Sequence, residues 1–351
     1  MSKEKMKALI AFDKDNLDLV EIDIPEPDDY EVLVKNEGCV FCNTTDRMIV
    51  KNLFATPAYP VAIGHECFGH VVKMGKKVKK YKIGDRVICA NAIVNGYNGT
   101  YYSSWGGFAE YGIAGDYETY LEEHGGVLDK ENAYRRRYRA NQIISNDLTM
   151  EEASLAFPLA EASSAIKQVG DITDKTVVIL GTGIVGFFFT YFAKQYGAKN
   201  VIVFGIDKER FPIAEKLGAD KTFVDKEEGT EYINSIGGAD IVFECCGNWR
   251  VFEDGIPYLR QGGMLACFAV PKQPYSLDLL KCPTDFVYKR IDPIVRNTIG
   301  EMCELLKSGK VPVDIFISHK WNFDEAPEAF KEVDKGAVIK GLVYICKNKD
   351  E

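Results

Sequence analysis

The sequence lacks an excess of basic residues, since 43 lysines and arginines face 52 aspartates and glutamates, for a formal net charge of −9. Nucleic acids and anionic membranes bind proteins through basic patches that displace counterions. We therefore expect neither as a partner, and a small molecule is the expected ligand. Internal repeats and low-complexity linkers are also missing. With 351 residues, of which 46% are hydrophobic, the chain is expected to bury the cores of two domains.

No secretory leader is expected either, because the charge-rich segment Met1 to Lys7 runs straight into the alternating segment KALIAF. The ten cysteines are therefore interpreted as free or metal-bound thiols, and a cytoplasmic protein is expected. One run without charge, Val177 to Ala193, contains three glycines near its start. These glycines divide it into a strand, a turn and a buried helix, so no transmembrane segment is predicted.

The hydropathy pattern has three parts. Short alternating runs from Met1 to Phe157 predict antiparallel β structure. From Pro158 to Tyr288 apolar strands alternate with helical stretches, which predicts a doubly wound parallel sheet of the Rossmann type. Residues 289–351, with an amphipathic helix around Pro293 to Lys307, are expected to return to the first domain. The predicted fold class is α/β, with domains at 1–157 and 158–288.

The segment GTGIVG follows a predicted strand and opens a predicted helix, the context in which such glycines bind a dinucleotide. Gly181 permits a tight turn, Gly183 lets the backbone approach a pyrophosphate, and Gly186 lets the helix pack closely. The helix start at Ile184 and Val185 supplies free N–H groups and a partial positive charge for that pyrophosphate.

An acid that binds the ribose hydroxyls is expected about 20 residues after the glycines. The corresponding position is Gly205, with Asp207 and Arg210 beyond it. Without an acid at 205, a 2′-phosphate fits and Arg210 can pair with it, whereas Asp207 repels it. The sequence thus predicts NAD or NADP as cofactor, and Asp207 favours NAD.

Two of the four histidines lie in the stretch AIGHECFGHVV. Thiolate and imidazole are preferred ligands of Zn²⁺, and a catalytic site keeps three protein ligands and one open position. Cys42 and His65 supply two such ligands, and the adjacent Glu66 favours a metal site over a structural role for His65. His70 lies in a valine-rich run and is interpreted as a packing residue.

Several segments together resemble the zinc-dependent branch of the medium-chain dehydrogenase/reductase family, the alcohol and polyol dehydrogenases. They are KALIAF, GCVFCNTTD, GHECFG, KIGDRV, GGFAEY, the glycine loop, ADIVFECCG, LRQGG and IKGLVYI. The resemblance spans the chain and implies a GroES-like, mostly-β catalytic domain beside the Rossmann domain. It also implies hydride transfer between a secondary alcohol, polyol or sugar-like, and the nicotinamide.

The resemblance implies a role for several single residues. Cys42 and His65 would bind a catalytic zinc acting as a Lewis acid, Glu66 would be a near or exchanging ligand, and Thr45 would relay the alcohol proton. Further positions match the cofactor site: Cys246 and Gly247 lie in the loop under the cofactor, Phe268, Ala269 and Val270 meet the nicotinamide amide, and Lys340 pairs with the pyrophosphate.

The chain departs from the family pattern beside the metal. Polyol members carry Glu-Pro-Leu where this sequence has Phe157-Pro158-Leu159. Because Pro158 suits a helix start, we expect Glu161 to lie one turn beyond Phe157 and to replace the missing carboxylate. The loop after Cys42 is one residue longer than usual, so Thr44 or Thr45 can be the relay; Thr45, next to Asp46, is the predicted one.

The four cysteines of the family's structural zinc site are absent between Ala90 and Trp105. The sequence therefore predicts one catalytic zinc and no structural zinc. The Asn-, Gly- and Tyr-rich loop found there suits a local turn or a contact between subunits, and a homodimer or homotetramer is expected. A longer segment between Tyr111 and Leu148 contains YRRRYR, which is a solvated face or a site for an anionic substrate group.

Two other functions remain open at this point. A zinc-free reductase of quinones or activated double bonds in the same superfamily would agree with Phe157. A dinucleotide-binding protein without turnover would agree with the glycine loop alone. Binding of the cofactor without metal or hydride transfer would distinguish the last one.

Overall fold

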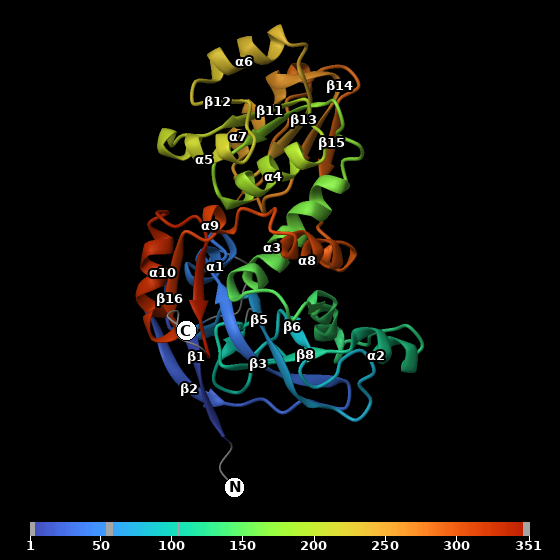
Figure 1. Ribbon diagram of the computed structural model, residues 1–351, viewed down its shortest axis with the longest axis vertical. Helices are drawn as coiled ribbons and strands as arrows, with labels where there is room; N and C mark the ends of the chain where they lie inside the picture. Colours follow the sequence, from blue (N-terminus) through green and yellow to red (C-terminus); the bar gives the residue numbers. More distant parts are fainter. Residues whose placement is uncertain (1–3, 54–58, 104, 272, 347–351) are drawn as a thin grey trace. The chain divides into compact units, whose positions relative to one another are not determined.

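The chain divides into two units, and each has its own sheet or sheets in the computed structural model (Figure 1). The structure describes residues 4–53, 59–103, 105–271 and 273–346. The first unit consists of Met1–Pro158 and Ile299–Glu351, and the second of Leu159–Thr298. The sequence-based boundary at 288/289 thus lies before residues 289–298, which belong to the second unit.

The first unit is built mainly from antiparallel strands in two sheets, with strand orders β2-β1-β4-β7 and β16-β17-β3-β5-β6-β9, and β8 pairs with β3. Its strands are β1 (Lys5–Ala11), β2 (Leu17–Asp23), β3 (Glu31–Val40), β4 (Val61–Ala62), β5 (Glu66–Met74), β6 (Arg86–Ile88), β7 (Tyr102–Ser103), β8 (Tyr111–Gly115), β9 (Ile143–Ile144), β16 (His319–Asn322) and β17 (Gly341–Tyr344). Its helical segments are α1 (Thr45–Val50), α2 (Tyr117–Glu123), the 3₁₀ segment η1 (Ala133–Ala140), α8 (Ile299–Lys307), α9 (Val313–Phe316), the 3₁₀ segment η6 (Phe323–Glu325) and α10 (Ala326–Asp334).

The core of the first unit explains why these strands form. Alternate residues of β3 and β5, such as Val32, Val34 and Val71, are fully or almost fully buried. The same hydrophobic cluster includes Trp321, Phe330 and other residues from the C-terminal segment. The last sixty residues therefore complete the core of the first unit, because β17 pairs antiparallel with β3.

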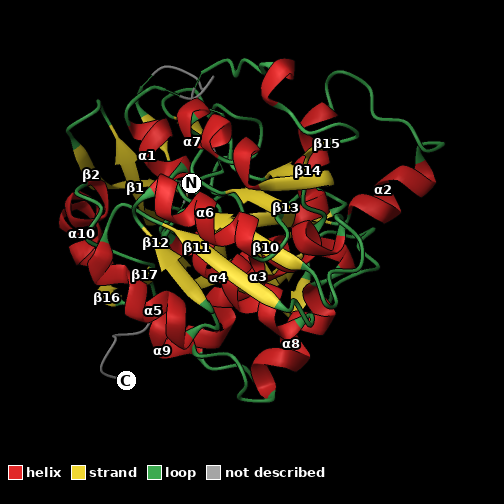
Figure 2. Ribbon diagram, turned by 90° about the horizontal axis from the view of Figure 1, so that it is seen from above, coloured by secondary structure: helices red, strands yellow, loops and turns green. Residues whose placement is uncertain are grey.

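The second unit is a six-stranded parallel sheet with strand order β12-β11-β10-β13-β14-β15 (Figure 2). Its elements are β10 (Thr176–Leu180), α4 (Ile184–Gln195), β11 (Asn200–Phe204), α5 (Phe211–Lys216), β12 (Lys221–Phe223), α6 (Lys226–Ser235), β13 (Ala239–Glu244), α7 (Trp249–Asp254), β14 (Leu259–Cys267) and β15 (Val287–Arg290), with 3₁₀ turns at Lys208–Arg210, Ile256–Tyr258, Leu279–Lys281 and Val295–Asn297. The direction of the connections reverses between β10 and β13, the switch point at which doubly wound sheets bind ligands.

One sequence-based expectation about the local structure is wrong. Pro158 does not start a helix; it lies inside α3 (Met150–Lys167). The helix begins after Thr149, whose hydroxyl accepts the N–H of Glu152 at 3.2 Å while the Glu152 carboxylate accepts the N–H of Thr149 at 2.8 Å. This capping box, a T-x-x-E pattern, outweighs the start signal of the proline.

Within the described ranges, no helix has both the length and the apolar character needed to cross a bilayer. The uncharged run singled out in the sequence forms β10, the glycine turn and α4 instead.

Candidate metal centre and dinucleotide site

Three metal-capable side chains meet where β3 and β5 pair. The register places Val40 of β3 opposite Glu66 of β5, so the chain that leaves β3 brings Cys42 beside His65. The Cys42 Sγ, a ring nitrogen of His65 and a carboxylate oxygen of Glu66 all lie within 4.8 Å of one another. The structure thus brings together three of the four predicted metal ligands.

A fourth side chain, Asp46, orients this group. It lies in the first turn of α1 and is fully buried. Its Oδ2 accepts the N–H of Cys42 at 2.9 Å, and its Oδ1 lies 3.5 Å from Nδ1 of His65. The other ring nitrogen, Nε2, lies 3.7 Å from Oε1 of Glu66 and therefore faces the ligand group. A carboxylate on the second nitrogen is the usual support of a metal-binding histidine.

The electrostatics of His65 reflect the same neighbours. Burial lowers the pKa of His65, but the contacts with Asp46 and Cys42 outweigh that effect and hold it well above its usual value. Asp46 and Cys42 thus make the surroundings of His65 anionic.

Glu66 also pairs with Lys340, and the two side chains are almost completely buried. Burial lowers the pKa of Lys340, and the charge of Glu66 together with Cys42 raises it above its usual value. The sequence assigned Lys340 to the cofactor pyrophosphate, which stays a prediction; the structure shows its partner within the first unit. The Lys340 side chain neutralises one carboxylate of the candidate centre.

This donor set suits zinc. It offers a thiolate, an imidazole and a carboxylate, the three side-chain types that bind Zn²⁺, and the imidazole is already held by Asp46. Thr45 is the first residue of α1 and is half-buried, whereas Thr44 is exposed. Glu161 lies on the part of α3 that belongs to the second unit, and its predicted role as a ligand remains a prediction.

Aromatic rings line one side of the candidate centre. The His65 ring lies 5.1 Å from that of Trp105 and 6.3 Å from that of Phe157, measured between centroids. The apolar ring of Phe157 thus lies beside the histidine, at the sequence position where polyol members carry a glutamate. The resemblance had singled out Phe157, whereas the contact of Trp105 with His65 had no signal in the sequence.

The segment without the four cysteines folds as a local turn. Asn98 Oδ1 accepts the N–H groups of Thr100 and Tyr101, and the rings of Tyr97 and Tyr102 lie 4.6 Å apart. Ala92 and Ile93 pack in a small apolar core of the first unit. Among the described residues, the only place where three or more metal-capable side chains meet is the one at His65.

The remaining candidates of the first unit lie elsewhere. His70 Nδ1 faces Glu37 at 3.3 Å and is not part of the metal-capable group. Cys67 and Cys89 are buried. Burial raises the pKa of Cys67 to about 12, so this thiol stays protonated.

In the second unit, the glycine loop has the geometry that a dinucleotide needs. Gly181 has a φ of +127°, which only glycine adopts readily. A Cβ at Gly186 would lie 1.9 Å from the carbonyl oxygen of Gly181, whereas a Cβ at Gly183 would meet nothing within 4 Å. The helix that starts at Ile184 and Val185 therefore packs closely on the loop, and its N-terminal side remains open at Gly183.

The end of β11 carries the residues that would meet the ribose. A Cβ at Gly205 would lie 2.5 Å from Cγ2 of Thr182, so an acid there would have to displace Thr182. Asp207 Oδ2 lies 3.4 Å from Nε of Arg210, and Arg210 also donates to the carbonyl of Thr182 at 3.2 Å. The negative charge of Asp207 and the positive charge of Arg210 thus partly neutralise each other at the end of β11.

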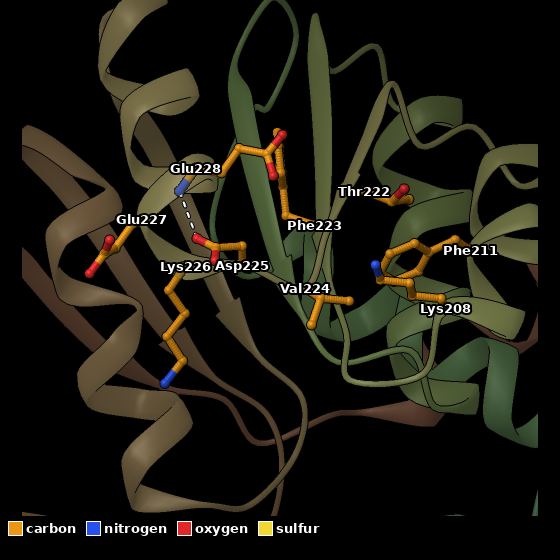
Figure 3. A pocket seen from close by; sticks show the side chains of 9 residues that line it. All are labelled: Lys208, Phe211, Thr222, Phe223, Val224, Asp225, Lys226, Glu227 and Glu228. Carbon is orange, nitrogen blue, oxygen red and sulfur yellow. Dashed lines mark hydrogen bonds between the residues drawn. The ribbon is translucent and has the colours of Figure 1, made fainter.

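Two cavities lie at the carboxyl ends of the parallel strands. The larger, about 760 Å³, lies between the ends of β11 and β12, with Lys208, Phe211 and Thr222 on one side and Asp225 to Glu228 on the other (Figure 3). The smaller, about 300 Å³, is lined by Gly247, Asn248, Trp249, Arg250 and Gln273. No motif in the sequence predicted the larger cavity, since its residues converge only when β11 and β12 pair.

The loops after β13 and β14 approach each other. A Cβ at Gly247, whose φ is +69°, would lie 2.5 Å from the carbonyl oxygen of Val270. Phe268 packs with its ring 5.1 Å from that of Phe189, and Cys246 donates to the carbonyl of Leu180 at 3.2 Å. These residues share the carboxyl edge of the sheet, beside the switch point.

Comparison with known proteins agrees with this geometry. The family model described as alcohol dehydrogenase GroES-like domain matches residues 28–121, and the one described as zinc-binding dehydrogenase matches residues 185–305. The chain belongs to the zinc-dependent medium-chain dehydrogenase family, in its alcohol and polyol branch. This dehydrogenase therefore transfers a hydride between an alcohol and NAD(P), and the predicted family, fold class and type of enzyme are confirmed.

Individual relatives match this dehydrogenase over almost its whole length. D-arabitol-phosphate dehydrogenase of Enterococcus avium is 28% identical and sorbitol dehydrogenase of Bombyx mori 23% identical. The alignments cover 96% of this chain in both cases and 96% and 98% of the relatives. Benzyl alcohol dehydrogenase of Acinetobacter calcoaceticus has the same fold, with a TM-score of 0.81, 20% identity and coverage of 98% of this chain and 100% of that one.

Proposed function

We propose that this dehydrogenase oxidises a secondary alcohol of a polyol at a single zinc site built on Cys42, His65 and Glu66. The observation that carries the proposal is the convergence of these three side chains within 4.8 Å, with Asp46 behind the histidine. The names of the Enterococcus avium and Bombyx mori relatives, which refer to arabitol phosphate and to sorbitol, support a polyol as substrate.

Each residue around the site has its own proposed role. When bound, zinc would supply Lewis-acid polarisation of the alcohol oxygen. Asp46 Oδ1 lies 3.5 Å from Nδ1 of His65, and a carboxylate there would favour the imidazole proton on Nδ1, which leaves the lone pair of Nε2 for a ligand. Lys340 compensates the buried charge of Glu66, which leaves that carboxylate beside the site as a near or exchanging ligand. Glu161 is the proposed additional carboxylate.

Thr45 is the proposed proton relay. Its position at the start of α1, half-buried and next to Asp46, suits a hydroxyl that accepts a proton from the substrate alcohol and passes it toward solvent. Because Met48 stands where the family often has a histidine, the proton leaves through water or the cofactor ribose. Thr45→Val is expected to lower kcat about 10²- to 10⁴-fold, as general acid–base groups do.

The cofactor site is proposed at the glycine loop, with the pyrophosphate against the N–H groups of Ile184 and Val185. Cys246, Gly247, Phe268 and Val270 are proposed to line the nicotinamide end. We also propose one zinc per chain and no structural zinc, since the segment from Ala90 to Trp105 has no cysteine and folds on apolar contacts.

The test is oxidation of a panel of polyols with NAD and with NADP by the wild type, Cys42→Ala, Asp46→Asn and Glu161→Ala. Cys346→Ser is the matched control, because Cys346 is an exposed thiol outside the site. We expect activity to disappear in Cys42→Ala, to fall in Asp46→Asn and Glu161→Ala, and to persist in the control. Reduction of quinones or enones by a wild type that oxidises no alcohol would instead favour a zinc-free reductase.

A further inference from the structure

The arginine-rich segment η1 is anchored by one of its arginines. Arg135 is 5% exposed and lies 3.4 Å from Glu31, and it also pairs with Asp28. A second anchor is Tyr138, which is buried and donates its hydroxyl to Glu31 at 2.5 Å. A Cβ at Gly115 would lie 1.9 Å from the Tyr138 ring, so the glycine at the end of β8 makes room for this anchor. The backbone of η1 is therefore fixed against β3 and β8.

Arg137 lies on a different side of the same segment. Its side chain is exposed, and its guanidinium carbon lies 5.5 Å from the centroid of the Trp105 ring. Desolvation by its neighbours lowers the pKa of Arg137, and no charge of opposite sign raises it. Across the described residues, no carboxylate forms an ion pair with this guanidinium. Arg137 thus differs from Arg135, whose charge is already paired within the fold.

Trp105 connects Arg137 with the metal centre. One side of its ring contacts the ring of His65 at 5.1 Å, and Arg137 lies over it within the range of a cation–π interaction. The backbone of Trp105 has a φ of +80°, which is unfavourable for a bulky residue and is typically retained at functional positions. The position of this ring therefore places an unpaired cation near the metal ligands.

We propose that Arg137, held over Trp105, binds a terminal phosphate group of the polyol that this dehydrogenase oxidises. This inference rests on the proposed polyol dehydrogenase function and names its substrate class, a phosphorylated polyol. The planar guanidinium matches the oxygens of a phosphate with two parallel hydrogen bonds.

The distances agree with a substrate of this kind. With carbon–carbon bonds of about 1.5 Å, an extended pentitol places a terminal phosphate roughly 6–8 Å from the carbon of its second hydroxyl. The ring centroids of His65 and Trp105 lie 5.1 Å apart, and the guanidinium carbon of Arg137 lies 5.5 Å from the Trp105 ring. The distance between the imidazole and the guanidinium therefore cannot exceed the sum of these two distances. One substrate molecule can therefore reach from the metal ligands to Arg137 once hydrogen-bond lengths are added at both ends.

The charge balance favours phosphate over a carboxylate. The protein as a whole carries −9, yet η1 has three exposed arginines at 136, 137 and 139 in addition to the buried one. A phosphate monoester carries about −1.5 to −2 charges at neutral pH, against −1 for a carboxylate. It thus gains more from a cation that the fold itself leaves unpaired.

The test compares kcat/KM for a pentitol, for the same pentitol with a terminal phosphate, and for the corresponding sugar acid. The variants are Arg137→Ala, Trp105→Leu and the matched control Arg136→Ala, which removes the same charge from an adjacent exposed position. We expect the wild type to prefer the phosphate. Arg137→Ala should lower that preference about 10- to 100-fold, the usual effect of losing a charged hydrogen bond. Trp105→Leu should lower it less, and Arg136→Ala by less than 3-fold.

Several outcomes would overturn the proposal. Equal kcat/KM for the free and phosphorylated pentitol in the wild type, or an equal loss on both in Arg137→Ala, would show that Arg137 binds no phosphate. A wild-type preference for the sugar acid would replace phosphate by carboxylate. Failure of the proposed function is distinguishable, because the wild type would then oxidise none of the three compounds.

Discussion

At the scale of single residues, the buried pair of Lys340 and Glu66 is the clearest case of two side chains that depend on each other. Lys340→Met leaves the Glu66 carboxylate buried without its cation, which is expected to lower the free energy of unfolding by about 3–5 kcal/mol. The double variant with Glu66→Gln removes the uncompensated charge and should recover part of that loss. Urea unfolding with a chelator in every sample measures both. Equal destabilisation of the single and the double variant would contradict the pairing.

Asp207 and Arg210 make a second prediction at this scale. Asp207→Asn removes the carboxylate 3.4 Å from Arg210, which lets the guanidinium act on a 2′-phosphate. Since the pair is partly exposed, the expected change is modest: NADP binding should improve about 5-fold relative to NAD. Fluorescence titration with both reduced cofactors measures the ratio, and Glu209→Gln is the control for loss of a nearby charge. An unchanged ratio would mean that Asp207 does not influence cofactor choice.

Single residues also show which features of the site could be predicted from the sequence and which could not. Cys42, His65 and Glu66 were predictable because each belongs to a short motif. The support of His65 by Asp46, the pairing of Glu66 with Lys340 and the contact of Trp105 with His65 were not. Each of them joins segments that are far apart in the chain or a turn whose geometry only the fold sets, and none leaves a pattern in the sequence.

At the scale of elements, Asp116 joins the start of α2 to the loop between β5 and β6. Its buried carboxylate accepts the N–H groups of Lys79 and Lys80 at 2.8 Å and that of Thr119 at 3.1 Å. Burial raises the pKa of Asp116, but these three hydrogen bonds outweigh it and hold the pKa below its usual 3.8. The stabilisation is therefore present above pH 3.8 and is lost as the pH falls through the lowered value.

Asp116→Asn is expected to lower the free energy of unfolding by about 1–3 kcal/mol at pH 7. The difference from the wild type should shrink as the pH falls below about 4, because the wild-type carboxyl then becomes protonated. Urea unfolding at both pH values measures this, with Glu118→Gln as the control for an exposed charge on the same helix. A difference independent of pH would show that charge is not the cause.

The elements were predictable where a periodic pattern met a turn signal. β10, the glycine turn and α4 follow from the apolar run and its glycines, and β11 and β13 from their uninterrupted apolar strands. The start of α3 was missed because a proline suits the first turn of a helix. The capping box at Thr149 and Glu152 begins the helix eight residues earlier.

At the scale of the whole molecule, the two units follow from the order of the motifs along the chain. The first unit is discontinuous, and the return of the last residues to it was predicted from the closing segment that now forms β17. The end of the second unit at residue 298 could not be read from the sequence. Strand β15 and the following turn join the parallel sheet through pairing with β14, and only the fold shows that pairing.

The measurement that tests the central claim most directly is the zinc content of the purified protein, prepared without chelator, beside Cys42→Ser and Cys346→Ser. The account predicts about one zinc per chain in the wild type and in Cys346→Ser, and loss of that zinc together with alcohol oxidation in Cys42→Ser. Two zinc ions per chain would contradict the absence of a structural site. No zinc, or zinc retained in full by Cys42→Ser, would contradict the proposed metal centre.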